Sequence, residues 1–190
     1  MIQICKQMKT RIITFLAEGF EEIEAITPID ILRRAECEVI TVSTTNSITV
    51  TGAHGISIVA DTLFSEMESF DADVIFLPGG MPGSLNLNAH EGVKHVVKQQ
   101  AQKGKFIAAI CAAPLILGGL GILQNKQATC YPGYENTLTG AEISKQSCVV
   151  DANIITGNGP GAAAKLGFTL VSLLKGEAIA NQWESGMMFS

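Results

Sequence analysis

Phe106-Ile-Ala-Ala-Ile-Cys111 is an apolar run of the kind that forms a central strand in a parallel sheet. The residues that follow, Ala112-Ala-Pro-Leu-Ile-Leu-Gly118, indicate a new helix. We therefore expect Cys111 on the sharp turn between strand and helix, above the carboxyl edge of the sheet. The first free N–H groups of that helix would favour a thiolate, so the sequence predicts a nucleophile here. A buried structural cysteine is the alternative, because cysteine is among the most buried residue types.

A second predicted strand also ends in a turn, in Asp73-Val-Ile-Phe-Leu-Pro-Gly-Gly80. Adjacent glycines let the main chain approach a bound group closely and turn its N–H groups toward an oxyanion or a small carboxylate. A simple turn is the alternative for this segment taken alone. Because parallel strands end at the same edge of a sheet, we expect Gly79 and Gly80 to lie beside Cys111.

An acidic segment, Glu18-Gly-Phe-Glu-Glu-Ile-Glu24, follows the first predicted strand. Apolar residues then recur at helical spacing, at Ile23, Ile26, Ile29 and Leu32. This spacing predicts a helix from near Glu21, and solvated carboxylates at Glu21 and Glu22 would complement its dipole. Glu24 is expected to point inward instead, where burial would raise its pKa and keep it protonated as a hydrogen-bond donor.

Five separated motifs resemble, in their order, the ThiJ/PfpI superfamily (class I glutamine amidotransferase-like), and within it the clade of the Parkinson-disease-associated deglycase and its bacterial relatives. The resemblance extends from about Arg11 to about Ala180. Its motifs are Ala17-Glu-Gly-Phe-Glu-Glu-Ile-Glu24, Pro28-Ile-Asp-Ile-Leu-Arg-Arg-Ala35, Val74-Ile-Phe-Leu-Pro-Gly-Gly80, Ile107-Ala-Ala-Ile-Cys-Ala-Ala-Pro114 and Thr156-Gly-Asn-Gly-Pro-Gly161. It implies that Cys111 is the reactive cysteine and that Glu24 is its protonated hydrogen-bond partner. The backbone N–H groups that it implies for a bound oxyanion are those of Gly79, Gly80 and Ala112.

One segment departs from the family pattern. Members with a Cys-His pair carry a histidine in the loop after the cysteine's helix, whereas Ala128-Thr-Cys-Tyr-Pro-Gly-Tyr134 has Tyr131 in that place. A tyrosine, with a pKa of about 10, is a poor general base near neutrality. The sequence therefore disfavours peptidase or amidase chemistry, and Tyr131 is expected to line the substrate site.

The histidines are not expected to replace the missing base. His90 and His95 lie in or beside the polar segment from Glu91 to Lys103, for which a solvated helix face is predicted. By the resemblance, His54 falls where a relative has a basic residue near the dimer contact. This implies a role for His54 at a subunit interface.

The resemblance implies an enzyme that acts on small reactive carbonyls such as methylglyoxal, or on their early adducts, as a cofactor-independent glyoxalase or deglycase in stress protection. Neither a metal nor an organic cofactor is expected, and the family implies a homodimer. In the expected mechanism Cys111 adds to an aldehyde carbon and Glu24 moves the proton, while the Gly79 and Gly80 amides hold the oxyanion. Two alternatives stay open. One is a redox sensor or holdase chaperone in which Cys111 oxidises to a sulfinate beside Glu24, and the other is a peptidase or amidase.

The composition predicts one α/β domain over residues 1–190, with residues 1–10 as an N-terminal extension. The chain of 190 residues is 47% hydrophobic and 16% charged, which suits a buried sheet. Its net charge of −5 and its lack of Lys/Arg clusters argue against nucleic acid as a partner. It has no apolar run of about 18 residues and no signal-peptide core, so we expect a cytoplasmic protein without a membrane partner.

The five cysteines are Cys5, Cys37, Cys111, Cys130 and Cys148. An odd number with no CxxC pair argues against a disulfide framework and against a zinc site. Cys37 and Cys148 adjoin strand-like runs and are predicted to be core residues. Cys130 is either a resolving thiol at the rim of the site or a buried strand residue.

Strand and helix signals alternate along the chain, which predicts a flavodoxin-like, doubly wound α/β fold with a mostly parallel sheet and helices on both faces. Strands are predicted near residues 11–16, 38–43, 73–77, 106–110, 127–131 and 154–157. Helices are predicted near residues 21–35, 91–103, 112–119 and 160–175. A small inserted β-hairpin is predicted from residues 47–51 and 56–60, and a second hairpin is expected to pair residues 147–150 with 154–156.

Overall fold

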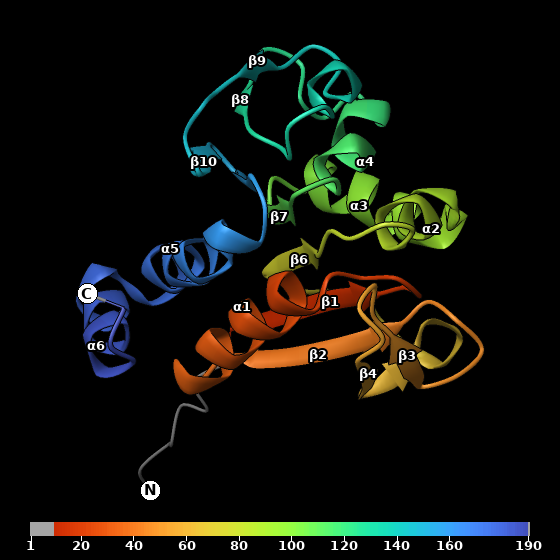
Figure 1. The fold of residues 1–190 in the computed structure, drawn as a ribbon, viewed down its shortest axis with the longest axis horizontal. Helices are drawn as coiled ribbons and strands as arrows, with labels where there is room; N and C mark the ends of the chain where they lie inside the picture. The colour runs from red at the N-terminus through yellow and green to blue at the C-terminus, as the bar shows by residue number, and fades with distance from the viewer. Residues whose placement is uncertain (1–9, 190) are drawn as a thin grey trace, which may run out of the picture.

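The computed structural model describes residues 10–189 and contains a seven-stranded sheet. Its strands are β1 (Arg11–Leu16), β2 (Glu38–Ser43), β5 (Thr62–Leu63), β6 (Val74–Leu77), β7 (Phe106–Ile110), β10 (Cys148–Asp151) and β11 (Ile154–Gly157). Their order in the sheet is β10-β11-β7-β6-β1-β2-β5. Figure 1 shows the central strands β7, β6, β1 and β2 in this order. Neighbouring strands are parallel except for β10 and β11, which are antiparallel. The order β2-β1-β6-β7-β11 is that of a flavodoxin-like sheet, so the predicted fold class is confirmed.

Helices cover both faces of the sheet (Figure 1). One face carries α1 (Glu22–Arg34), α5 (Ala163–Lys175) and α6 (Glu177–Gly186), and the other carries α2 (Gly83–Ala89), α3 (Glu91–Gln102) and α4 (Pro114–Gly119). Strand β1 supplies both cores, because Ile12 and Leu16 face the first helical layer whereas Ile13 and Phe15 face the second. All four side chains are fully buried, and burial of each contributes about 1.5–3 kcal/mol.

A β-hairpin of β3 (Thr49–Thr51) and β4 (Ser57–Val59) forms a two-stranded sheet of its own, as predicted. It is held against the loop between β1 and α1, where the Gly19 N–H donates to the carbonyl oxygen of Thr51 at 2.8 Å. The hairpin therefore lies beside the first turn of α1. The second predicted hairpin is also present, as the antiparallel pair of β10 and β11.

The prediction of a strand over residues 127–131 is wrong beyond its first two residues. Only β8 (Gln127–Ala128) is extended, and it pairs with β9 (Glu142–Ile143) away from the main sheet. The backbone then turns toward the end of β7, because the Tyr131 N–H donates to the carbonyl oxygen of Cys111 at 2.9 Å. The segment thus becomes part of the site instead of part of the sheet.

The predicted helices begin and end close to their observed bounds, with two differences. Helix α4 begins at Pro114, after the turn at Cys111, and the helix expected from residue 160 begins as a 3₁₀ turn before α5. Neither α2 nor α6 was predicted. The 3₁₀ turns within residues 10–189 are η1 (Phe64–Glu66), η2 (Glu135–Thr137) and η3 (Pro160–Ala162).

No helix within residues 10–189 is both long enough and apolar enough to cross a membrane. The predicted N-terminal extension lies outside the described residues except for Thr10. Cys5 lies outside them as well.

Candidate active site

Cys111 lies directly after β7 and before α4, on the strand-to-helix turn that the sequence predicted. Its φ of 64° is in the left-handed region, which costs a residue with a Cβ roughly 1–3 kcal/mol and is retained mostly at functional sites. The turn is held from the neighbouring strand, because the Cys111 N–H donates to the carbonyl oxygen of Gly157 at 2.9 Å. The side chain is 9% exposed, so it is nearly buried without being sealed off.

Gly79 and Gly80 follow β6 and lie beside Cys111, as predicted. A Cβ at Gly79 would collide with Oε2 of Glu24 and with the Cβ of Cys111, so only glycine fits between these two side chains. Gly80 has a φ of 94°, a backbone conformation that side chains with a Cβ rarely adopt. Both glycines are thus required by the local geometry.

The three backbone N–H groups expected around an oxyanion do not all point to the same side chain. Those of Gly80 and Ala112 face the sulfur of Cys111, whereas that of Gly79 faces the carboxyl group of Glu24. An oxyanion formed next to the sulfur would therefore find two of the expected donors, Gly80 and Ala112. The placement of Gly79 differs from the expectation because Glu24 occupies the space beneath its amide.

Glu24 is fully buried on the first turn of α1, pointing inward as predicted. Neither carboxyl oxygen has a well-formed hydrogen bond to a described residue. Burial raises the pKa of Glu24 to about 7, even though the Cys111 side chain and the Gly79 N–H favour its charged form. The direction of the predicted shift is confirmed, and Glu24 exchanges a proton near neutral pH.

Cys111 is a thiol, not a thiolate, at neutral pH. Burial and then the charge of Glu24 raise its pKa to about 12, and the N–H groups of Gly80 and Ala112 offset only part of this rise. The expectation that the amides at the helix start would stabilise a thiolate is therefore wrong for the resting protein. Burial and the nearby carboxylate raise the pKa of Cys111 by more than the N–H groups at the start of the six-residue helix α4 lower it.

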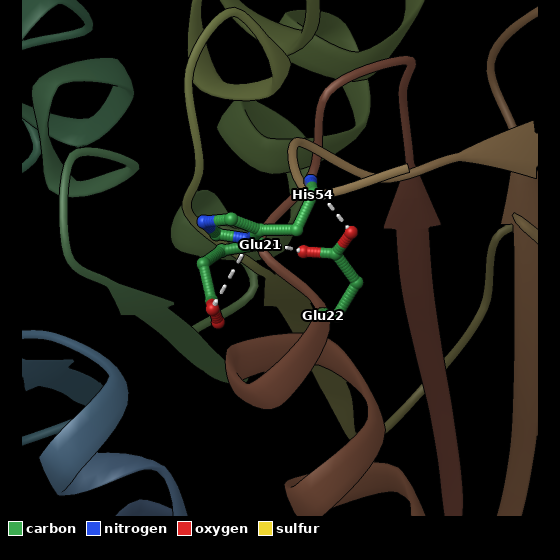
Figure 2. Close-up of side chains that lie close together, drawn as sticks. All are labelled: Glu21, Glu22 and His54. Atoms are coloured by element: carbon green, nitrogen blue, oxygen red, sulfur yellow. Dashed lines mark hydrogen bonds and ion pairs between the residues drawn. The ribbon is translucent and has the colours of Figure 1, made fainter. Parts of the chain in front are cut away.

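Glu21 and Glu22 are buried, at 8% and 5% exposed, and the expectation of solvated carboxylates is wrong. Glu21 caps α1, because its Oε2 accepts the Glu24 N–H at 2.7 Å. Glu22 holds the tip of the β3–β4 hairpin, since its Oε1 accepts the His54 N–H at 2.8 Å and its Oε2 lies 2.7 Å from Nδ1 of His54 (Figure 2). The second contact of Oε1 is with the Ile56 N–H at 3.4 Å.

The Glu22–His54 contact changes the proton affinity of both groups. Burial alone would raise the pKa of Glu22, but the hydrogen bonds from the side chain and backbone of His54 outweigh it, and the pKa is lowered. The hydrogen bond to Glu22 raises the pKa of His54. Within the described residues, one ligand atom each from Glu21, Glu22 and His54 lie within 4.8 Å of one another, a spacing that a metal ion tolerates. Their bonds to the helix start and to the hairpin explain this geometry, and we assign them a structural role.

A cavity of about 590 Å³ opens above Cys111. It is lined by Glu21, Glu22, Ile23, Glu24, His54, Ile56, Gly80, Met81, Cys111, Ala112, Tyr131, Tyr134 and Pro160. Tyr131 lines it and is 46% exposed, and its role in binding substrate stays a prediction. Pro160 belongs to the segment Gly157-Asn-Gly-Pro-Gly161, which lies beside Cys111 through the bond from Cys111 to Gly157.

Residues 10–173 match the sequence profile of the DJ-1/PfpI family. The chain belongs to this family. It is 40% identical over 164 residues to Protein DJ-1 homolog B of Arabidopsis thaliana, an alignment that covers 85% of this chain and 37% of the plant protein. It is 32% identical over 168 residues to a deglycase of Pyrococcus abyssi, covering 87% of this chain and 99% of that protein. The solved structure of oxidized Toxoplasma gondii DJ-1 superposes with a TM-score of 0.91 at 31% identity, covering 94% of this chain and 98% of that one.

The other described cysteines of this DJ-1/PfpI chain are free and buried, and none lines the cavity. Cys37 and Cys148 belong to the core, as predicted. Cys130 is 6% exposed but is not in a strand, and burial and then the charge of Glu135 raise its pKa to about 11. A thiol in this state is a poor partner for thiol exchange, which disfavours a resolving role for Cys130.

Two of the histidines have contacts that the sequence did not suggest. His90 is the N-cap of α3, where its Nδ1 accepts the Val93 N–H at 3.2 Å, and its ring packs on Phe64 with centroids 4.5 Å apart. The solvated position predicted for His90 is therefore wrong, whereas His95 is exposed on α3 as expected. In this DJ-1/PfpI chain His54 contacts Glu22 and also lines the cavity. The expected role of His54 at a subunit interface stays a prediction.

Proposed function

We propose that this protein is a cysteine-dependent enzyme that acts on small reactive carbonyls, as a glyoxalase or deglycase in stress protection. The observation that carries the proposal is the buried pair of Glu24 and Cys111 at the floor of an open cavity. The deglycase name of the Pyrococcus abyssi relative, which aligns over 99% of its length, supports it. The chain spans only 37% of the Arabidopsis relative, so no activity is carried over from that protein.

The first step is addition of the thiol to the aldehyde. A thiol whose pKa is about 12 needs a base, and Glu24, whose pKa is about 7, is a carboxylate above neutrality. The proton on Sγ passes to the Glu24 carboxylate while Sγ bonds to the aldehyde carbon. The carbonyl oxygen becomes an oxyanion next to the N–H groups of Gly80 and Ala112, and it then takes the proton from Glu24 to form a hemithioacetal.

The second step converts the hemithioacetal into a hydroxy acid. The Glu24 carboxylate removes the proton from the carbon bonded to sulfur, and an enediolate forms with the neighbouring carbonyl, whose oxygen takes the proton of the hemithioacetal hydroxyl group. Glu24 returns the proton to that neighbouring carbon, which leaves a thioester on Cys111. Water then cleaves the thioester, so that methylglyoxal plus water gives lactate and the free thiol without an oxidant or a reductant.

A redox sensor is the competing account, and one experiment separates the two. Methylglyoxal consumption and lactate formation are measured with purified protein, and a second sample is treated with dilute peroxide and analysed by intact mass. Loss of methylglyoxal with matching lactate supports the enzyme. Sulfinate on Cys111 without turnover of methylglyoxal contradicts it and favours the sensor.

We also propose that the active form is a homodimer. Ile23 and Ile26 are 54% and 40% exposed on α1, which supports an interface near this helix. Light scattering coupled to size-exclusion chromatography tests the proposal: we expect the mass of two chains at micromolar concentration. The mass of one chain at every concentration would contradict it.

A further inference from the structure

We infer that Asn158 is a site of spontaneous modification, where conversion to aspartate or isoaspartate alters the loop beside Cys111. Asn158-Gly159 is the only Asn-Gly pair in the sequence. It lies in the loop between β11 and η3. The modification needs water but no substrate, so it is independent of the proposed function.

The reaction begins with the backbone nitrogen of the residue that follows the asparagine. The nitrogen of Gly159 bonds to Cγ of Asn158, and the side-chain nitrogen leaves as ammonia together with the proton of the Gly159 N–H. One water molecule then opens the resulting cyclic imide at either of its two carbonyl carbons. The product is aspartate, or isoaspartate, in which the main chain runs through the former side chain. Asparagine and water thus give an acid and ammonia, and nothing is oxidised or reduced.

The reacting groups of this pair are accessible to each other and to water. Glycine has no Cβ, so the approach of its nitrogen to the side chain of the preceding residue is less hindered than for any other residue. Within residues 10–189, neither the side chain of Asn158 nor the Gly159 N–H forms a hydrogen bond. The Asn158 side of the loop is held by its backbone instead, since the Asn158 N–H donates to the carbonyl oxygen of Ser147 at 3.0 Å. Asn158 is half-buried, so water reaches the imide.

Other asparagines lack this combination. Nδ2 of Asn153 donates to the carbonyl oxygen of Lys105 at 2.9 Å, which holds the side-chain amide in place. Asn46 is exposed in a loop, but the following N–H, that of Ser47, donates to Oγ1 of Thr45 at 3.0 Å. Exposure alone therefore predicts the first reaction at Asn46, whereas access to the attacking nitrogen predicts it at the Asn-Gly pair.

The loop that carries the pair holds the reactive cysteine and part of the cavity wall. The carbonyl oxygen of Gly157 accepts the Cys111 N–H at 2.9 Å, and Pro160 lines the cavity. A Cβ on Gly159 would lie 3.2 Å from the ring of Tyr131, so the loop packs closely against this side chain. Isoaspartate lengthens the main chain by one carbon atom just before Gly159. The loop has to move to accommodate it, and the contacts on both sides of the pair change.

Both products also place a negative charge in the loop where the amide was neutral. The pKa of Cys111 is already raised by burial and by the charge of Glu24. A further carboxylate, one residue from the carbonyl group that accepts the Cys111 N–H, disfavours the thiolate in the same sense. We therefore expect Cys111 to react more slowly after modification, and most slowly in the isoaspartate form.

Ageing of the purified protein tests the modification itself. The wild type is incubated at mildly alkaline pH, and peptide mapping follows the loss of each asparagine, while an isoaspartate-specific methyltransferase reports the isoaspartate formed. We expect Asn158 to convert several-fold faster than Asn46, and Asn158→Gln to remove most of the isoaspartate signal. Conversion at Asn46 that equals or exceeds that at Asn158, or an Asn158 that stays intact while it converts in urea, would overturn the inference.

Alkylation by iodoacetamide tests the effect on Cys111. The labelling rate is compared for fresh wild type, aged wild type, Asn158→Asp and fresh Asn158→Gln, the last of which keeps a neutral amide. We expect slower labelling in the aged protein and in Asn158→Asp, and the fresh wild-type rate in Asn158→Gln. An aged protein that has lost Asn158 but labels at the fresh rate would overturn the link between the loop and the cysteine. Neither measurement depends on lactate formation, so a failure of the proposed function leaves both results interpretable.

Discussion

The carboxyl group of Glu24 and the thiol of Cys111 face each other across Gly79, at which no Cβ would fit. Burial raises the pKa of both groups, and the charge of Glu24 raises that of Cys111 further. The two groups therefore titrate as a pair, and the thiol loses its proton most easily to its neighbour. This relationship predicts how the protein responds to pH and to substitution.

The pH dependence of Cys111 alkylation is expected to report the ionisation of Glu24. With Glu24 as the base, the rate with iodoacetamide should rise around pH 7, where the carboxyl group loses its proton, and then level off. Glu24→Gln should abolish this rise in the alkylation rate around pH 7. A wild-type rate that climbs about tenfold per pH unit without a plateau, as expected for a thiol of pKa about 12 acting alone, would refute the role of Glu24.

Glu24→Gln is also expected to slow conversion of methylglyoxal by roughly 10²-fold or more, because glutamine fills the space but transfers no proton. Deuterium from heavy water should appear at C2 of the lactate made by the wild type, since a carboxyl group exchanges its proton with solvent. Glu18→Gln, an exposed substitution in the preceding loop, is the matched control and should keep the wild-type rate. Lactate without deuterium at C2 would indicate a direct hydride shift and would contradict proton transfer by Glu24.

Stability should change with pH in the opposite sense to that of an ordinary surface carboxylate. The pKa of Glu24 is raised from 4.5 to about 7 by folding, so the folded state binds more protons between these values and stability falls as pH rises through them. The loss from this group amounts to about 2–3 kcal/mol between about pH 5 and about pH 8. Urea unfolding of the wild type and of Glu24→Gln at both pH values measures it. The same pH dependence of stability in the two proteins would show that folding does not raise the pKa of Glu24.

Glu22 is expected to hold the β3–β4 hairpin in place. Glu22→Gln weakens the bonds to the His54 N–H and Nδ1 and should cost about 1 kcal/mol of stability, because a neutral acceptor replaces a charged one. Hydrogen exchange at His54 and Ile56 should become faster. Glu18→Gln is the control, since Glu18 accepts the Thr51 N–H of the same hairpin from an exposed position. Unchanged exchange in Glu22→Gln would contradict the anchoring role.

The architecture was predictable because its signals are local. Apolar runs mark the strands, and the run that ends at Cys111, followed at once by a helix, predicts both the strand and the turn. The segment 127–131 shows the limit of such signals. It has a strand-like start, but its backbone bonds to Cys111, and this contact depends on the position of β7.

The electrostatics of the site were predictable only in part. The raised pKa of Glu24 follows from its burial, but the spacing of apolar residues did not predict its inward position, because Ile23 and Ile26 of that pattern are exposed. The contact between Glu22 and His54 joins residues 32 positions apart and exists only because the hairpin packs on the start of α1. The pKa of Cys111 was expected to fall because of the helix amides, whereas burial and Glu24 raise it, and their relative size depends on distances that a sequence does not contain.

Lactate formation from methylglyoxal by three proteins tests the central claim most directly: the wild type, Cys111→Ala and Cys130→Ala. Cys130→Ala is the matched control, because Cys130 is a buried thiol that does not line the cavity. We expect lactate from the wild type and from Cys130→Ala, and none above background from a folded Cys111→Ala. Wild-type lactate production by Cys111→Ala would contradict the account.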